Sequence, residues 1–195
     1  MRKGGRAVSR GSHSGMVIVF LAEGFEEIEA LTPVDILRRA GFAVKTAAVG
    51  SSKLVRGSHG IPVEADILAA DVEEESPEAV ILPGGMPGAL NLDASPEVDA
   101  VLRAADRKGA VIGAICAAPL VLGRRGMLEG RRAACYPGFE KELKGAVTEG
   151  GRVEVDGRFV TACGMGAATE FSLALVDLMK GERAAKELGA SILAK

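Results

Sequence analysis

The sequence has 195 residues, 48% of them hydrophobic and 26% charged, which is enough chain for one ordinary domain with a buried core. Its 24 Lys+Arg and 26 Asp+Glu leave a formal net charge of -2, and 4% of the residues are aromatic, so neither phosphate attraction nor base stacking favours a nucleic-acid partner. No apolar run approaches the roughly 20 residues that a membrane-spanning helix needs, and we expect no membrane partner.

Residues 1–15 differ from the rest of the chain in composition. They are basic, lack acidic residues and are rich in Gly and Ser. We therefore expect a disordered leader or an expression remnant, followed by a single domain over residues 16–195. Because His13 falls in the leader, His59 is the one histidine of the predicted domain.

The three cysteines show neither a CxxC pattern nor a Cys/His ligand spacing. An odd number of cysteines without such spacing is typical of reduced thiols in a cytosol. We therefore expect a cytoplasmic protein with no metal site and no other cofactor.

The first predicted elements are a strand and a helix. Residues 16–21 form a continuous, β-branched apolar run, which predicts a strand buried on both faces. Within residues 23–41, apolar side chains recur at helical spacing: Ile28, Leu31, Val34 and Leu37. Because Thr32 and Pro33 resemble a cap and a first helical position, we expect the helix to kink or restart at Pro33, with residues 26–29 in a turn before it.

The middle of the chain alternates between strands and helices. Strands are expected over residues 42–49, 79–82 and 110–115. A β-excursion is expected over residues 54–67, with its turn at Gly57-Ser58-His59-Gly60.

Two helices are expected between and after these strands. Ser95-Pro96-Glu97 has the cap, the proline and the acid of a helix start, and this helix is expected to end at Gly109. A second helix is expected over residues 117–122, directly after Cys116.

The C-terminal part continues the alternation. A short strand is expected over residues 132–136, and Asp156-Gly157 between β-like flanks predicts a hairpin over residues 153–160. One helical face carries the residues Ala168, Phe171, Leu175 and Leu178. A last short helix follows Gly181. Strands that alternate with helices predict a single α/β domain with a doubly wound, mostly parallel sheet, which would bind ligands at the carboxyl ends of its strands.

The strongest functional signal is Cys116, which stands between a buried strand and a helix start. Small residues lie two positions before and two after it in Ala114-Ile115-Cys116-Ala117-Ala118, as a nucleophile elbow requires. A thiol at a helix start faces the positive end of the helix dipole, which predicts a lowered pKa. We expect a thiolate nucleophile, and the alternative is an inert cysteine buried among alanines, as we expect for Cys135.

Two weaker signals lie at the ends of other strands. Leu82-Pro83-Gly84-Gly85 follows a buried strand, and its glycines would let backbone amides approach an oxyanion, although Pro-Gly-Gly is also common in plain turns. Glu26, Glu27 and Glu29 follow the first strand, where an acidic cluster usually forms a solvated face. Glu29 could instead be partly buried, protonated and hydrogen-bonded to a thiolate.

Several segments in this chain form a specific set when they are taken in order: Phe25-Glu26-Glu27-Ile28-Glu29-Ala30, Pro33-Val34-Asp35, Leu82-Pro83-Gly84-Gly85, Ala114-Ile115-Cys116-Ala117-Ala118-Pro119, and Gly164-Met165-Gly166 before Glu170-Phe171. Together they resemble the ThiJ/PfpI superfamily, and within it the branch of the Parkinsonism-associated deglycase and its bacterial relatives. The likeness covers nearly the whole chain from Met16 onward.

This resemblance implies a flavodoxin-like sandwich and a homodimer whose interface includes early helical residues. It implies Cys116 as the nucleophile, with the Glu29 carboxyl hydrogen-bonded to it. It implies an oxyanion and substrate-binding pocket at Gly84, Gly85 and Ala117. The activities implied are glutathione-independent glyoxalase, deglycation of early adducts, and stress sensing or chaperoning, with a small carbonyl compound as substrate.

Four positions depart from the pattern of the family. Ala117 stands where the protease-like branch has a histidine, so we reject a peptidase. Tyr136 stands where the deglycase branch often has a histidine, and His59 and Cys163 stand in place of two arginines that commonly line the pocket. His59 could act as a base, although a lone histidine at a Gly-rich turn is more often a surface residue. Cys163 could resolve an oxidised Cys116, although a packing role is favoured.

Two functions therefore stay open. The first is an enzyme in which Cys116 attacks the aldehyde of a small α-dicarbonyl or glycation adduct and Glu29 moves protons until a hydroxy acid leaves. The second is a redox sensor or chaperone-like stress protein in which Cys116 is oxidised to a sulfinate that accepts a hydrogen bond from protonated Glu29. The missing histidine favours the second, and the Cys–Glu–oxyanion set is neutral between them.

Overall fold

Seven strands form one sheet and two more form a separate hairpin in the computed structural model, which describes residues 15–72 and 77–194. The strands of the sheet are β1 (Met16–Leu21), β2 (Ala43–Ala48), β5 (Ile67–Leu68), β6 (Ala79–Leu82), β7 (Val111–Ile115), β8 (Val153–Asp156) and β9 (Phe159–Ala162). Their order is β5-β2-β1-β6-β7-β9-β8, and neighbours are parallel except for the antiparallel pair β8 and β9. The leader predicted for residues 1–15 lies, except for Gly15, outside the described residues.

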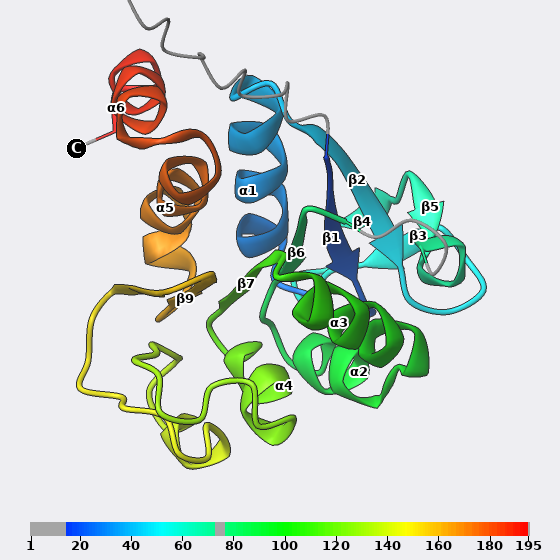
Figure 1. The fold of residues 1–195 in the computed structure, drawn as a ribbon. Coiled ribbons are helices and arrows are strands. Elements are labelled where there is room, and N and C mark those ends of the chain that lie inside the picture. Colours follow the sequence, from blue (N-terminus) through cyan, green and yellow to red (C-terminus); the bar gives the residue numbers. More distant parts are fainter. Residues whose placement is uncertain (1–14, 73–76, 195) are drawn as a thin grey trace, which may run out of the picture.

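Helices cover both faces of the sheet, so the molecule has three layers (Figure 1). One face carries α1 (Glu27–Arg39), α5 (Ala168–Lys180) and α6 (Glu182–Ser191). The other face carries α2 (Gly88–Ala94), α3 (Pro96–Lys108) and α4 (Pro119–Arg124). Short 3-10 helices lie at η1 (Ala69–Val72), η2 (Glu140–Glu142) and η3 (Met165–Ala167). No helix of the described residues is long and apolar enough to cross a membrane.

The strand β1 shows why the sheet is buried on both faces. Val17 and Val19 pack in the cluster under α1 and α5, whereas Ile18 and Phe20 pack in the cluster under α3, and all are 0% exposed. Successive side chains of a strand point to opposite faces, so one continuous apolar run contributes to two cores. The prediction of an α/β domain with a mostly parallel sheet is confirmed.

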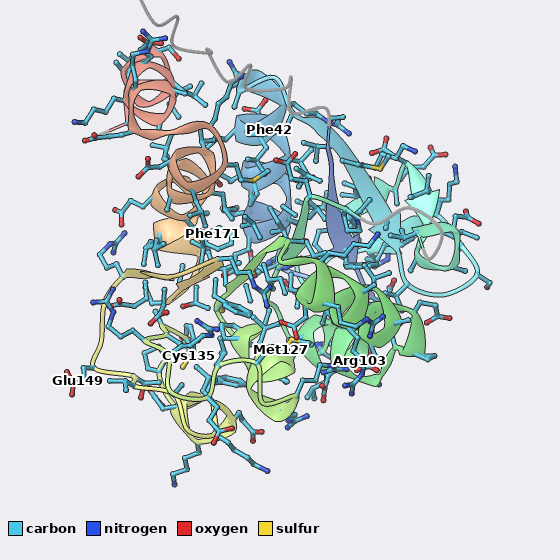
Figure 2. The ribbon with its side chains drawn as sticks, in the orientation of Figure 1. Phe42, Arg103, Met127, Cys135, Glu149 and Phe171 are labelled. Carbon is cyan, nitrogen blue, oxygen red and sulfur yellow. The ribbon has the colours of Figure 1, made fainter. Side chains whose placement is uncertain are left out.

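The layer of α5 packs closely on the strand that leads to Cys116. Phe171 lies on α5 (Figure 2) and packs in the cluster between that helix and the sheet, and a Cβ atom at Gly113 of β7 would lie 2.9 Å from Phe171 Cζ. A glycine in a strand interior often marks such a close approach. The large ring therefore takes the space that a side chain on β7 would need.

Helix α1 differs from the sequence prediction around Pro33. It runs from Glu27 to Arg39 with Pro33 inside it, so the predicted restart at Pro33 and the turn over residues 26–29 are wrong. The buried face of the helix carries the residues Ala30, Pro33, Val34 and Leu37. Burial of this face against the sheet outweighs the hydrogen bond that proline cannot make.

The same register leaves two apolar side chains of α1 outside the core. Ile28 and Leu31 share the helical spacing of Val34 and Leu37, but they are 46% and 38% exposed. The helix therefore presents an apolar stripe to the surface as well as one to the sheet.

Most of the other predicted elements are confirmed. The excursion forms the antiparallel hairpin of β3 (Leu54–Arg56) and β4 (Pro62–Glu64), and Ser95 caps α3 through its Oγ at 3.2 Å from the Val98 amide. The strand predicted over residues 132–136 is wrong. Its backbone makes an isolated bridge from Arg132 to Val147 and otherwise bonds to loop and side-chain atoms, so no ladder forms.

Candidate active site

Cys116 lies just beyond β7, at the carboxyl edge of the sheet. Its φ angle is 64°, a left-handed value that is uncommon outside glycine. The backbone is held from two sides, because the Cys116 amide donates to the Ala162 carbonyl and the Cys116 carbonyl accepts from the Tyr136 amide, both at 2.8 Å. The predicted elbow is present, although α4 begins at Pro119 rather than at residue 117.

Glu29 lies on the first turn of α1 and is 1% exposed. Its Oε2 accepts the amide hydrogen of Gly84 at 2.9 Å, and the Met165 amide and the Cys116 thiol also hydrogen-bond to the carboxyl group. The strands β1, β6 and β7 are parallel neighbours, so the segments that follow them meet at one edge of the sheet. The topology therefore brings Glu29, Gly84 and Cys116 together.

Gly84 has no room for a side chain. A Cβ atom there would lie 2.6 Å from Glu29 Oε2 and 2.7 Å from Cys116 Cβ. The sequence placed Gly84 in the oxyanion pocket. In the structure its amide donates to Glu29, so Gly84 positions the carboxyl group and does not offer that amide to an oxyanion. The amides of Gly85 and Ala117 hydrogen-bond to the Cys116 sulfur and are the pair that can stabilise negative charge there.

Gly84→Ala is expected to destabilise the protein by about 1–3 kcal/mol and to change the alkylation rate of Cys116, because the added methyl group must displace Glu29 or Cys116. Thermal unfolding and iodoacetamide labelling measure the two effects. Gly166→Ala is the matched control, since nothing lies within 4 Å of a Cβ atom at Gly166. Equal unfolding temperatures for the two variants would contradict the close packing.

Burial controls the charge of both reactive groups. It raises the pKa of Glu29 to about 7, and the negative charge of Glu26 adds to this rise. Burial and then the neighbouring Glu29 carboxyl raise the pKa of the Cys116 thiol to about 12. The amides of Ala117 and Gly85 lower this pKa, but their effect is smaller. Burial and the carboxyl both oppose the predicted lowering of the thiol pKa, because the half-buried sulfur lies beside a carboxyl group and α4 begins beyond it.

Glu29 and Cys116 titrate as a pair. Two negative charges cannot share this small space cheaply, so the pair loses one proton near neutral pH and keeps the second to far higher pH. Between these limits one proton is shared across a carboxyl–thiol hydrogen bond. A group able to take the thiol proton is thus in place when sulfur forms a bond.

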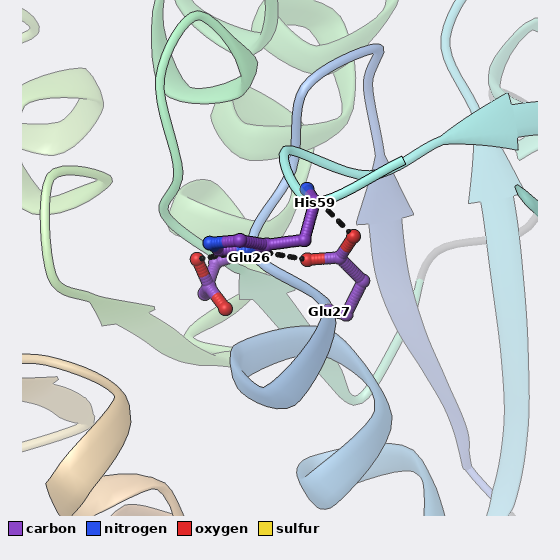
Figure 3. Close-up of side chains that lie close together, drawn as sticks. All are labelled: Glu26, Glu27 and His59. Carbon is purple, nitrogen blue, oxygen red and sulfur yellow. Dashed lines mark hydrogen bonds and ion pairs between the residues drawn. The ribbon is translucent and has the colours of Figure 1, made fainter. Parts of the chain in front are cut away.

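His59 lies on the turn between β3 and β4 and pairs with glutamates other than Glu29 (Figure 3). Its Nδ1 lies 3.0 Å from Glu27 Oε2 and 3.6 Å from Glu26 Oε2. The hydrogen bond to Glu27 and the two negative charges raise the pKa of the imidazole. The structure therefore assigns His59 to Glu27, and not to the carboxyl group that contacts the thiol.

Tyr136 and Cys163 border the elbow through the backbone. Tyr136 is 52% exposed, and its amide bonds the Cys116 carbonyl. Cys163 follows Ala162, whose carbonyl accepts from Cys116, and it packs partly buried against the cluster under α1 and α5. Cys135 is buried in the opposite cluster (Figure 2), where burial raises its thiol pKa to about 11, in agreement with a structural role.

Two features of the site were not predicted from the sequence. The Met165 amide holds the Glu29 carboxyl, and the charge of Glu26 acts on the same group. The glycines on either side of Met165 were a signal for a backbone that approaches closely, but they did not show what it approaches. Among the described residues, the group that could hold a metal ion is Glu26, Glu27 and His59.

The layered α/β fold and the half-buried cysteine on a sharp turn after a strand define a flavodoxin-like protein with a nucleophile elbow. The chain belongs to the DJ-1/PfpI family, whose model matches residues 16–178. Toxoplasma gondii DJ-1, in an oxidised form, has a similar structure, with a TM-score of 0.88 and 39% identity over 92% of this chain and 98% of that one.

Curated relatives agree with this assignment. Protein DJ-1 homolog B of Arabidopsis thaliana is 36% identical over 93% of this chain, which spans only 42% of that relative's length. The Parkinson disease protein 7 homolog of Danio rerio is 34% identical over 91% of this chain and 96% of its own length. A Caenorhabditis elegans relative named glutathione-independent glyoxalase DJR-1.2 is 33% identical over 85% of this chain and 88% of its own.

Proposed function

We propose that this protein is a cysteine-dependent enzyme acting on small reactive aldehydes or glycation adducts, of the glutathione-independent glyoxalase or deglycase type. The observation that carries the proposal is the hydrogen-bonded pair of Cys116 and Glu29, with the amides of Gly85 and Ala117 on the sulfur. The relative named as a glyoxalase supports the same chemistry. Ala117 directly after the nucleophile argues against a peptidase.

The reaction begins when the Cys116 sulfur attacks the aldehyde carbon of an α-dicarbonyl such as methylglyoxal. A carbon–sulfur bond forms, the thiol proton passes to the Glu29 carboxylate, and the carbonyl electron pair moves onto oxygen. The amides of Gly85 and Ala117 stabilise this oxyanion. The oxyanion then takes the proton back from Glu29, which leaves a hemithioacetal and a carboxylate.

Glu29 next moves a proton between neighbouring carbon atoms. As a carboxylate it removes the proton from the carbon bound to sulfur and returns it to the adjacent carbon after the electrons rearrange, while the hydroxyl proton of the hemithioacetal passes to the oxygen of the former ketone. The aldehyde carbon is thereby oxidised to a thioester while the ketone carbon is reduced to an alcohol, so no external oxidant is needed. Water cleaves the thioester, lactate leaves, and the Cys116 thiol is restored.

The test is the formation of lactate from methylglyoxal without glutathione, measured beside a titration with mild peroxide and mass spectrometry of the cysteines. Enzymatic lactate formation above the uncatalysed rate supports the proposal. Selective oxidation of Cys116 in a protein that makes no lactate would refute it and support the second candidate.

That second candidate is a redox-sensing or chaperone-like role without turnover. The observation that favours it is the raised pKa of Glu29, about 7, which keeps a proton available near neutral pH. Two equivalents of a hydroperoxide would oxidise the Cys116 thiol to a sulfinate and be reduced to the alcohol or water. A protonated Glu29 could donate a hydrogen bond to that sulfinate.

We also propose that the protein forms a homodimer through α1. Ile28, Leu31 and Ile61 are 46%, 38% and 53% exposed, and all three line one open groove of about 710 Å³. Large apolar side chains gathered on one surface are typical of protein interfaces. The resemblance to the ThiJ/PfpI superfamily favours the same face.

Leu31→Glu is expected to convert a dimer into a monomer at micromolar concentration, because the interface would have to bury an unpaired charge. Light scattering measures the mass in solution. Leu178→Glu, at a leucine of the same 38% exposure on α5, is the matched control and should leave the mass unchanged. A wild-type mass of a single chain would contradict the dimer.

A further inference from the structure

A second group of polar side chains lies where the β3–β4 turn meets the start of α1 (Figure 3). Glu26, Glu27, Ser58 and His59 converge there, and we refer to these four residues as the acid–imidazole cluster. The reaction proposed above uses none of them to form or break a bond. The cluster therefore needs its own explanation.

The backbone holds the cluster in place. The Ser58 amide donates to the Phe25 carbonyl at 2.8 Å, which fixes the turn against the start of α1. The Glu27 side chain is 6% exposed, and its Oε1 accepts from the amides of His59 at 2.9 Å and Ile61 at 3.4 Å. Glu27 Oε2 is left facing the imidazole at 3.0 Å. Such outer hydrogen bonds on a carboxylate are what orient metal ligands in proteins.

The donor atoms of Glu26, Glu27 and His59 all lie within 4.8 Å of one another, so they can reach one ion. His59 Nδ1 lies 3.0 Å from Glu27 Oε2 and 3.6 Å from Glu26 Oε2. Ser58 Oγ lies 3.1 Å from His59 Nδ1, and it lies 3.1 Å and 3.4 Å from Oε2 of Glu26 and Glu27. Ligands at the usual zinc distances of about 2.0–2.2 Å are about 3.3–3.6 Å apart when the geometry is tetrahedral. Two of these distances, 3.4 Å and 3.6 Å, fall in that range, and the three of 3.0–3.1 Å are hydrogen-bond lengths that would open by a few tenths of an ångström around an ion.

The donor types also select a class of ion. An imidazole nitrogen with carboxylate oxygens suits Zn²⁺ and its first-row neighbours, whereas Mg²⁺ and Ca²⁺ prefer oxygen ligands alone. A divalent cation would take the place of the imidazole proton and balance the charge of the two carboxylates.

We propose that the acid–imidazole cluster binds one divalent transition-metal ion, best matched by Zn²⁺, through Glu26, Glu27 and His59, with Ser58 Oγ or water as the fourth ligand. The competing explanation is an ion pair of protonated His59 with the two carboxylates, which would satisfy the same hydrogen bonds without an ion. This proposal is independent of the proposed aldehyde chemistry, and direct binding measurements separate the two explanations.

Calorimetric titration of the full chain with Zn²⁺ is expected to show one equivalent bound. His59→Ala and Glu26→Gln are each expected to weaken binding by about tenfold or more, because each removes one of three protein ligands. His13→Ala removes the other histidine of the chain and is the matched control, with the wild-type affinity expected. Cys116→Ser should also keep that affinity, because no sulfur belongs to the cluster.

Co²⁺ gives an independent spectroscopic readout. Bound at the cluster, it should show d–d absorption without a thiolate charge-transfer band, and His59→Ala should lose that absorption. Glu27 is left unchanged in these tests, because replacing so buried a carboxylate would report on folding. Three results would each overturn the proposal: no wild-type binding at millimolar Zn²⁺, unchanged affinity in His59→Ala, or a charge-transfer band that disappears in Cys116→Ser.

Discussion

Replacing Cys116 with serine is expected to abolish lactate formation from methylglyoxal, with a loss of at least about 10³-fold. A hydroxyl is a far weaker nucleophile than a thiol. Glu29, whose pKa is raised only to about 7, is too weak a base to ionise it. Serine fits the same space, so the backbone bonds that hold the elbow stay intact. Lactate release per mole of enzyme measures the loss, and thermal unfolding confirms that the variant folds.

Cys135→Ala is the matched control for this experiment. Cys135 lies in the cluster on the other face of the sheet, so its replacement should cost about 1 kcal/mol of stability and leave turnover intact. Turnover that survives in Cys116→Ser, or that disappears in a folded Cys135→Ala, would show that the chemistry does not run through Cys116.

The fold was largely predictable because its central strands can be recognised from local sequence. A strand buried on both faces must be apolar throughout, so continuous apolar runs such as Met16–Leu21 and Ala79–Leu82 predict strands. The start of α1 was not predictable from local rules. Thr32 and Pro33 have the pattern of a helix start, and only packing on the sheet shows that the helix begins earlier. A local pattern does not report the free energy of that packing.

The candidate site was predictable in its members and less so in its chemistry. Cys116, Glu29 and Gly85 each follow a strand or begin a helix at one edge of a parallel sheet, so the topology alone brings them together. The use of the Gly84 amide by Glu29 depends on distances that a sequence does not contain. The charge states depend on burial, which is likewise a property of the folded chain.

The acid–imidazole cluster was hidden from the sequence for a related reason. Metal sites are recognised in sequences by the short spacing of their ligands, and Glu27 and His59 are separated by 32 positions. The predicted absence of a metal site rested on that spacing. The hairpin of β3 and β4 folds back over the start of α1 and brings the two segments into contact.

Glu29→Gln is expected to separate the reactivity of the thiol from turnover. In the wild-type protein, burial and the neighbouring carboxyl raise the pKa of Cys116 to about 12. Glutamine is neutral, so it removes the upward effect of the carboxylate and leaves the amides of Ala117 and Gly85 to favour the thiolate. The pKa of Cys116 should therefore fall, while turnover should fall by about 10²-fold or more because no carboxylate moves protons.

The dependence of turnover on pH provides a second test of this prediction. Burial keeps Glu29 protonated below a pKa of about 7, so wild-type turnover should drop about tenfold per unit as the pH falls below that value, and Glu29→Gln should lack this acid limb. Glu29→Asp keeps a carboxylate one methylene group further away, so its turnover should be intermediate and its thiol pKa should stay raised. Iodoacetamide alkylation of Cys116, followed against pH beside lactate formation, measures both properties. One result would contradict this prediction: a wild-type thiol that titrates well below its ordinary pKa of ~8.5, with the same alkylation midpoint in Glu29→Gln. The negative charge would then reside on sulfur beside a protonated Glu29, and Glu29 would not be the base.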